Sequence, residues 1–174
     1  MIGRIIHWVY CLPIGHAALF ALVATGAYFW LYRKFSQKRW WPAAVIGMLL
    51  CWAAVVLAHT LLSRGEGTAV LSPVPFQTYI TVLNGGEREL LRSAFMNVLL
   101  FYPGALLLRS ILPRGTGWLV VLGLFAATVT IEVCQYALQL GYAETDDVLH
   151  NTLGALLGVL ACRQYEKHNK TPKG

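Results

Sequence analysis

The sequence predicts an all-α membrane protein, a polytopic bundle of about five transmembrane helices with the N-terminus outside and the C-terminus inside (N-out/C-in). Three observations predict it: 57% of the 174 residues are hydrophobic, only 13% are charged, and the apolar residues fall in five separate runs. Soluble domains carry roughly 25% charged residues. The net charge of +6 does not indicate nucleic-acid binding, because the basic residues lie in short segments between apolar runs.

An α-helix needs about 20 apolar residues to cross a bilayer. The runs cover residues 8–31, 41–62, 95–112, 117–138 and 148–161. The last run is short and must include flanking residues such as Asp147 and Arg163. The first run is followed by basic residues rather than preceded by them, which indicates an uncleaved helix instead of a signal peptide.

The distribution of charge predicts the orientation. Lys and Arg accumulate on the cytoplasmic side of membrane proteins. With the N-terminus outside, most basic residues fall in inner segments and most acidic residues in outer ones. An even number of helices would break this alternation. The tail 166–174 is therefore expected to be cytoplasmic, where its basic residues contact anionic headgroups.

Residues 63–90 form the long extracytoplasmic loop. Its segment 72–75 contains two prolines and cannot be helical throughout. The apolar residues of 76–83 then recur at helical spacing, which predicts a short helix in the outer membrane interface, ended by Asn84-Gly85-Gly86. The alternative is an ordinary loop packed over the bundle.

One polar stripe lies on the fifth helix. Asp147, Asn151, Gly154 and Gly158 share a helical face, polar at its outer end, with a Gly-x-x-x-Gly segment that permits close helix packing. Thr145 or Asp146 is the expected N-cap of this helix. On the third helix, Asn97 shares a face with Gly104.

Glu132 lies in the outer half of the fourth helix, roughly 12 Å below its outer end. A lone carboxylate at that depth costs several kcal/mol unless it is protonated, paired or hydrated, so we expect it to face the bundle interior. Gln135 and Gln139 are expected on the same face. One interpretation is a protonated Glu that joins two helices; the other is a role in binding or chemistry.

The predicted topology brings the polar residues of three helices to the outer leaflet. The resulting candidate site for a ligand consists of Arg92, Asn97, Glu132, Gln135, Asp146, Asp147 and Asn151. The cysteines Cys11, Cys51, Cys134 and Cys162 have no spacing typical of a zinc site or a disulfide framework, and are expected to be small buried residues.

Three segments of the sequence resemble the motifs of the VanZ-like family. Residues 91–104 are similar to its N-x-L-L-F-x-P-x-G segment, 131–135 to I-E-x-x-Q, and 146–158 to D-D-x-x-x-N-T-x-G-A-x-x-G. The resemblance, which includes the upstream Pro-Phe at 75–76, covers about 73–163. Many members carry an Arg just before the acidic pair; this sequence does not, and Arg92 is the candidate substitute.

The resemblance divides the chain into three parts besides the loop. Residues 91–165 form a VanZ-like core of three helices, 1–62 form an added helix pair or include one added helix, and 166–174 form the tail. The family is associated with teicoplanin-type glycopeptide resistance, which implies a role in the bacterial cell envelope and a multi-pass location in the cytoplasmic membrane. It supplies no settled biochemical activity.

The leading hypothesis is a non-enzymatic protein that binds or shields a lipophilic ligand at the outer leaflet, without a cofactor. Its expected partners are membrane lipids and a lipid-linked envelope precursor or lipoglycopeptide, and a homo-oligomer is compatible. One alternative is an intramembrane enzyme acting on a lipid carrier or peptidoglycan precursor. Glu132, Asp146 and Asp147 would then bind a divalent cation or act as acid and base. A small transporter that couples ions through Glu132 is a third reading.

Overall fold

The computed structural model describes residues 14–62 and 70–169, most of them helical. Its helices are α2 (Ile14–Phe35), α3 (Trp41–Leu57), α4 (Gln77–Leu83), α5 (Glu89–Ile111), α6 (Gly117–Ala137) and α7 (Thr145–His168). A π-helical turn, η1 (Ala58–Leu62), continues α3, and two short strands complete the fold: β1 (Val70–Ser72) and β2 (Tyr142–Glu144). The predicted all-α bundle is confirmed.

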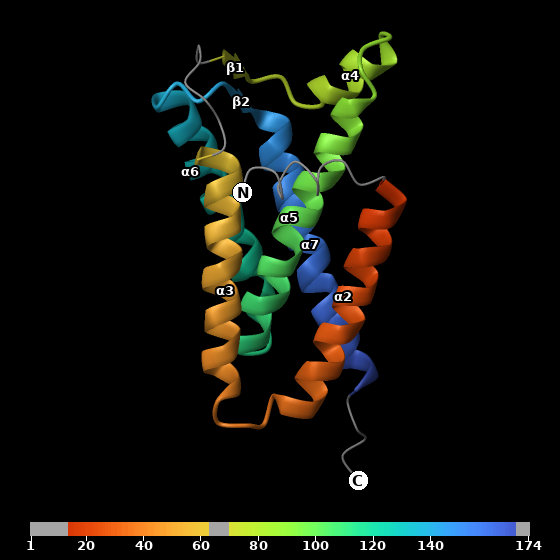
Figure 1. Ribbon diagram of the computed structural model, residues 1–174, viewed down its shortest axis with the longest axis vertical. Coiled ribbons are helices and arrows are strands. Elements are labelled where there is room, and N and C mark those ends of the chain that lie inside the picture. The colour runs from red at the N-terminus through yellow and green to blue at the C-terminus, as the bar shows by residue number, and fades with distance from the viewer. Residues whose placement is uncertain (1–13, 63–69, 170–174) are drawn as a thin grey trace.

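The five long helices run lengthwise and alternate in direction (Figure 1). α4 and the two strands lie together at one end, which we call the α4 end. The turns that join α2 to α3 and α5 to α6 lie at the opposite end, together with the C-terminal end of α7. This alternation is the arrangement that a five-span topology requires.

Within the described ranges, four helical segments are long and apolar enough to cross a membrane: Ile14–Phe35, Trp41–Leu62, Glu89–Ile111 and Gly117–Ala137. α7 is not among them, because acidic residues at its start and charged residues near its end shorten the apolar stretch. Its 24 residues nevertheless rise about 36 Å, more than the roughly 30 Å hydrocarbon core. The count of five spans and the N-out/C-in orientation stay predictions.

The predicted end of the first helix shifts, whereas that of the short helix does not. The first helix reaches Phe35 instead of residue 31, and residues 8–13 of the predicted run lie outside the described residues. The predicted short helix after the prolines is present as α4, and it ends where Asn84 is followed by Gly85 in the left-handed conformation (φ 87°). Glycine adopts that conformation without the steric cost that other residues meet.

α5 is the central helix of the bundle, and α7 packs closely along it. A Cβ at Gly154 would overlap the carbonyl oxygen of Val98, and a Cβ at Gly158 would lie 2.6 Å from the carbonyl oxygen of Tyr102. The glycine face of α7 thus lies directly against the backbone of α5. Such contact is possible only without side chains between the helices.

α3 covers another side of α5. Gly104 faces the indole of Trp52, which a Cβ at this position would overlap. The indole Nε1 donates a hydrogen bond to the carbonyl oxygen of Leu100 (2.8 Å). α2 is peripheral by comparison: among its residues only Ala17 is buried, and Thr25 Oγ1 donates to the hydroxyl of Tyr102 (3.1 Å).

The strands β1 and β2 pair in parallel at the α4 end, with Leu71 opposite Ala143. This pairing joins the long loop before α4 to the loop between α6 and α7. The pairing of the two strands was not predicted from the sequence, because each strand has only three residues.

The prediction that all cysteines are buried is wrong for Cys51, which is exposed on α3. Cys134 is partly buried and Cys162 is buried, whereas Cys11 lies outside the described residues. A small apolar side chain has no need to be buried in a membrane protein, because lipid is as apolar as the protein interior.

Candidate functional site

Two polar side chains of α7 join this helix to its neighbours. Asn97 Nδ2 of α5 donates to Asp147 Oδ1 (2.6 Å), and one turn further along α7, Asn151 Nδ2 donates to Thr128 Oγ1 of α6 (2.7 Å). Asn97, Thr128 and Asn151 are buried. Hydrogen bonds gain electrostatic strength in such surroundings, so these contacts help to hold the three helices together.

The predicted polar residues of α6 bind backbone groups. Glu132 Oε2 accepts the N–H of Glu144 in β2 (2.9 Å), and Gln135 Nε2 donates to the carbonyl oxygen of Thr60 in η1 (2.9 Å). Gln139 does not share this face, contrary to prediction. α6 ends at Ala137, so Gln139 lies beyond the helix, in the left-handed conformation (φ 54°).

Asp146 stabilises a helix other than its own. Its Oδ1 accepts the backbone N–H of Phe76, the N-cap residue of α4 (2.5 Å), and its Oδ2 accepts that of Thr78 in the first turn (2.7 Å). The prediction that Thr145 or Asp146 caps α7 is wrong, because Glu144 holds the N-cap position and makes no side-chain capping bond. A carboxylate at a helix N-terminus satisfies N–H groups that have no partner within the helix.

His150 also connects α7 to α4, and the sequence analysis missed it. The imidazole is buried, and its Nε2 lies 2.9 Å from the hydroxyl of Tyr79. The available signal was its spacing: His150 follows Asp146 by four residues and therefore shares its face of the helix. That face contacts α4, whereas the face of Asp147 and Asn151 contacts α5 and α6.

Arg92 lies near the start of α5. Its Nη1 donates to Glu89 Oε1 (2.6 Å), one turn earlier in the same helix. Among the described residues, Glu89 is the ion-pair partner of Arg92. Arg92 therefore does not substitute for the arginine that many members of the VanZ-like family carry just before the acidic pair. Its Nε and Nη2 atoms are shielded from solvent and have no hydrogen-bond partner in the part of the chain that the structure describes.

The three predicted metal-ligating carboxylates bind different elements. Asp146 accepts bonds from α4, Asp147 from α5 and Glu132 from β2. Across residues 14–62 and 70–169, no three His, Cys, Asp or Glu residues are grouped so that they could hold a metal ion. The divalent-cation site therefore stays a prediction without a convergent set of ligands in these ranges.

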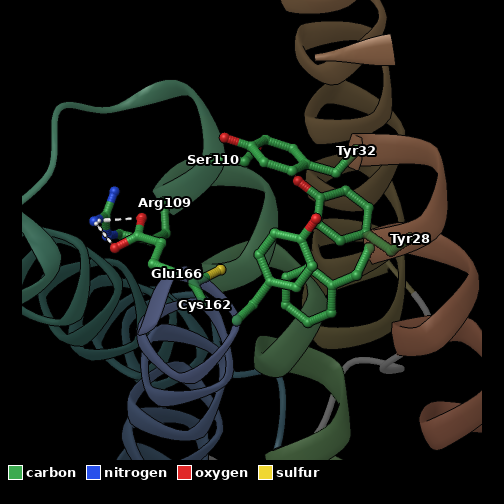
Figure 2. A pocket seen from close by; sticks show the side chains of 8 residues that line it. Tyr28, Tyr32, Arg109, Ser110, Cys162 and Glu166 are labelled. Atoms are coloured by element: carbon green, nitrogen blue, oxygen red, sulfur yellow. Dashed lines mark hydrogen bonds and ion pairs between the residues drawn. The ribbon is translucent and has the colours of Figure 1, made fainter. Parts of the chain in front are cut away.

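A pocket lies at the opposite end of the bundle, between α2, α5 and α7 (Figure 2). Its volume is about 20 Å³, little more than the space that one water molecule needs, and it is partly open to the surface. Tyr28, Phe29, Tyr32, Arg109, Ser110, Cys162, Tyr165 and Glu166 line it. Of the residues predicted for the site at the α4 end, the structure joins Asn97 to Asp147, whereas the others bind separate elements.

Arg109 and Glu166 form an ion pair beside this pocket (Figure 2). The predicted cytoplasmic tail 166–174 begins at Glu166. In the structure α5 extends to Ile111 and α7 to His168, so the pair lies between two helices, with Nη2 and Oε1 2.9 Å apart. The Arg109 side chain is only 3% exposed.

The role of Asp146 gives a testable expectation. Asp146→Ala removes the acceptor for two N–H groups of α4, and we expect a loss of about 1–2 kcal/mol of local stability. Faster hydrogen exchange at the backbone amides of Phe76 and Thr78 would measure this loss of stability. Asp146→Asn keeps one acceptor oxygen, so its exchange rates should fall between those of the unmodified protein and those of Asp146→Ala. Glu87→Ala, an exposed change at the same end, is the control; equal exchange in all variants would contradict the capping role.

The fold and the buried polar contacts define an α-helical, multi-pass membrane protein. A family model described as VanZ/LLP1 matches residues 45–165, which is more than half of the chain. The protein therefore belongs to the VanZ/LLP1 family. Comparison with curated proteins and with solved structures gave no match.

The matched range begins within α3, upstream of the motifs at 73–163. It leaves α2 outside and includes most of α3. Whether the N-terminal segment is an added helix pair or includes one added helix stays a prediction.

Proposed function

We propose that this protein is a non-enzymatic component of the bacterial cell envelope that lies in the cytoplasmic membrane with its α4 end outward. There it binds or shields a lipophilic ligand, and thereby contributes to teicoplanin-type glycopeptide resistance or to envelope homeostasis. The observation that carries the proposal is an exposed apolar surface at the α4 end, held over the buried polar contacts by Asp146.

We call this surface the apolar cap. Its members are large hydrophobic side chains of α4, the strands and the loop between them, all exposed: Leu71, Val74, Phe76, Ile80, Leu83 and Tyr142. Leu83 is 86% exposed. Exposed apolar side chains gathered at one end are unfavourable in water but favourable in the membrane interface or against an acyl chain.

The cap and the polar residues beneath it suit an amphiphilic ligand. An acyl or isoprenoid tail would contact the cap and the outer parts of the helices, while a polar head would reach the first turn of α5. The carboxylates of Glu132, Asp146 and Asp147 accept hydrogen bonds from other elements. That arrangement supports a binding role over acid–base chemistry, because these groups already stabilise the fold.

A change at the surface of the cap tests the proposal without disturbing the core. We expect Leu83→Asp to abolish protection of a glycopeptide-sensitive host against an acylated, teicoplanin-type drug, because a charge in the cap opposes contact with a lipid tail. The measurement is the minimum inhibitory concentration at matched protein levels in the membrane. For a glycopeptide without an acyl chain, the minimum inhibitory concentration should differ less between the sensitive host and the same host that produces this protein.

Asn84→Asp is the matched control, because it adds the same charge at the neighbouring exposed position outside the cap. We expect it to protect as the unmodified protein does. Full protection by the Leu83→Asp variant would remove the cap from the mechanism. Turnover of a polyprenyl or phospholipid substrate by the purified protein would favour the enzyme instead.

A further inference from the structure

We infer that Arg92 binds a phosphate group of the ligand at the α4 end, through its Nε and Nη2 atoms. The inference rests on the proposed function and specifies the chemistry of the ligand's head. Both atoms are buried and have no hydrogen-bond partner, and the Arg92 side chain is 18% exposed. A guanidinium group keeps its charge in proteins, so these N–H groups require an acceptor.

The two atoms form one recognition edge. The Nε–H and an N–H of Nη2 point in the same direction, spaced to match two oxygen atoms of a phosphate or carboxylate. The remaining amino group, Nη1, donates to Glu89 Oε1 (2.6 Å). Glu89 therefore fixes the side chain, and no hydrogen bond within the described residues uses the bidentate edge.

Within the described ranges, no carboxylate of the protein completes this edge. Both carboxylate oxygens of Asp146 accept backbone N–H groups at the start of α4. Asp147 Oδ1 accepts a hydrogen bond from Asn97, and Glu132 Oε2 accepts one from the backbone of β2. A buried N–H without an acceptor costs about 1–3 kcal/mol, and more on a charged group. An anionic ligand that supplies two oxygens would remove this cost.

The surroundings favour phosphate on a lipid over other anions. α4 packs against α5 and presents Phe76, Ile80 and Leu83 as part of the apolar cap. Lipid headgroups carry phosphate at the boundary between apolar and polar surroundings, where Arg92 lies. Arg88 lies one turn before Arg92 but is exposed, and Glu87 and the paired Glu89 keep the local charge near balance.

Short-chain lipids test the inference with the purified full-length protein. We expect dioctanoyl phosphatidic acid to bind at least about tenfold more tightly than dioctanoylglycerol, which lacks the phosphate, as measured by native mass spectrometry. Arg92→Gln should abolish the difference. Arg92→Lys keeps the charge but not the bidentate edge, and should lose about tenfold in affinity for phosphatidic acid.

Arg88→Gln is the matched control and should bind phosphatidic acid as the unmodified protein does. Inorganic phosphate separates the two sources of the group: equal affinity would assign the site to free phosphate, and weaker affinity would assign it to a lipid. In either outcome, Arg92→Gln should abolish the binding. Equal binding of the two lipids, or an Arg92→Gln variant that elutes as a folded protein and retains the difference, would overturn the inference.

The two proposals fail separately. If Arg92→Gln leaves lipid binding unchanged while Leu83→Asp abolishes protection, the phosphate site is wrong and the proposed function stands. If lipid binding depends on Arg92 while no variant alters protection, the site stands and the resistance role is wrong.

Discussion

Gly154→Ala is expected to destabilise the protein by about 2 kcal/mol or more, because the new methyl group would overlap the carbonyl oxygen of Val98. A backbone atom inside a helix has no rotamer by which it could move aside, so α5 and α7 must separate. The separation would also lengthen the contact between Asn97 and Asp147. The measurement is unfolding in mixed micelles, followed by circular dichroism or by tryptophan fluorescence.

Gly123→Ala is the matched control, because a Cβ at this position on α6 meets no atom within 4 Å. Alanine is the better helix former by about 1 kcal/mol, so this variant should be as stable as the unmodified protein or slightly more so. Equal stability of the two variants would show that α7 does not contact α5 through its glycine face.

Glu166→Ala is expected to cost about 3–5 kcal/mol, the range found when one partner of a buried ion pair is removed. The Arg109 guanidinium would keep its charge between the helices without a carboxylate. Its Nη1 would retain only the carbonyl oxygens of Leu112 and Pro113, at 3.2 and 3.4 Å. The same unfolding measurement applies, with Lys167→Ala, an exposed change one residue away, as the control.

A double variant separates the pair from its surroundings. Arg109→Met combined with Glu166→Leu replaces both charges by apolar groups, and should be more stable than Glu166→Ala alone. If Glu166→Ala is no less stable than the Lys167→Ala control, the pair does not stabilise the junction of α5 and α7.

The helices could be predicted from the sequence because the length of an apolar run is itself the requirement for crossing a bilayer. α6 begins at Gly117 as predicted, and α3 with η1 covers the predicted 41–62. The fifth helix was less clear, since its apolar run is short and charged residues lie within its first and last turns. Its ends became defined only through contacts, those of Asp146 with α4 and of Glu166 with Arg109.

The residues of the site could be named, but their partners could not. Adjacent positions on a helix point about 100° apart, so Asp146 and Asp147 necessarily contact different elements. The sequence does not state that the element facing Asp146 is α4, a segment 68 to 70 positions earlier. The pairing of β1 with β2 is equally remote, and three residues per strand leave no period to detect.

α7 makes a polar contact with another helix near each of its ends. Its first turn holds the start of α4 through Asp146, and its last turns neutralise the charge of Arg109 through Glu166. A single uninterrupted helix between the two is stiff over its whole length. A displacement of α4 would therefore be passed along this helix toward the Arg109–Glu166 contact at the opposite end of the bundle.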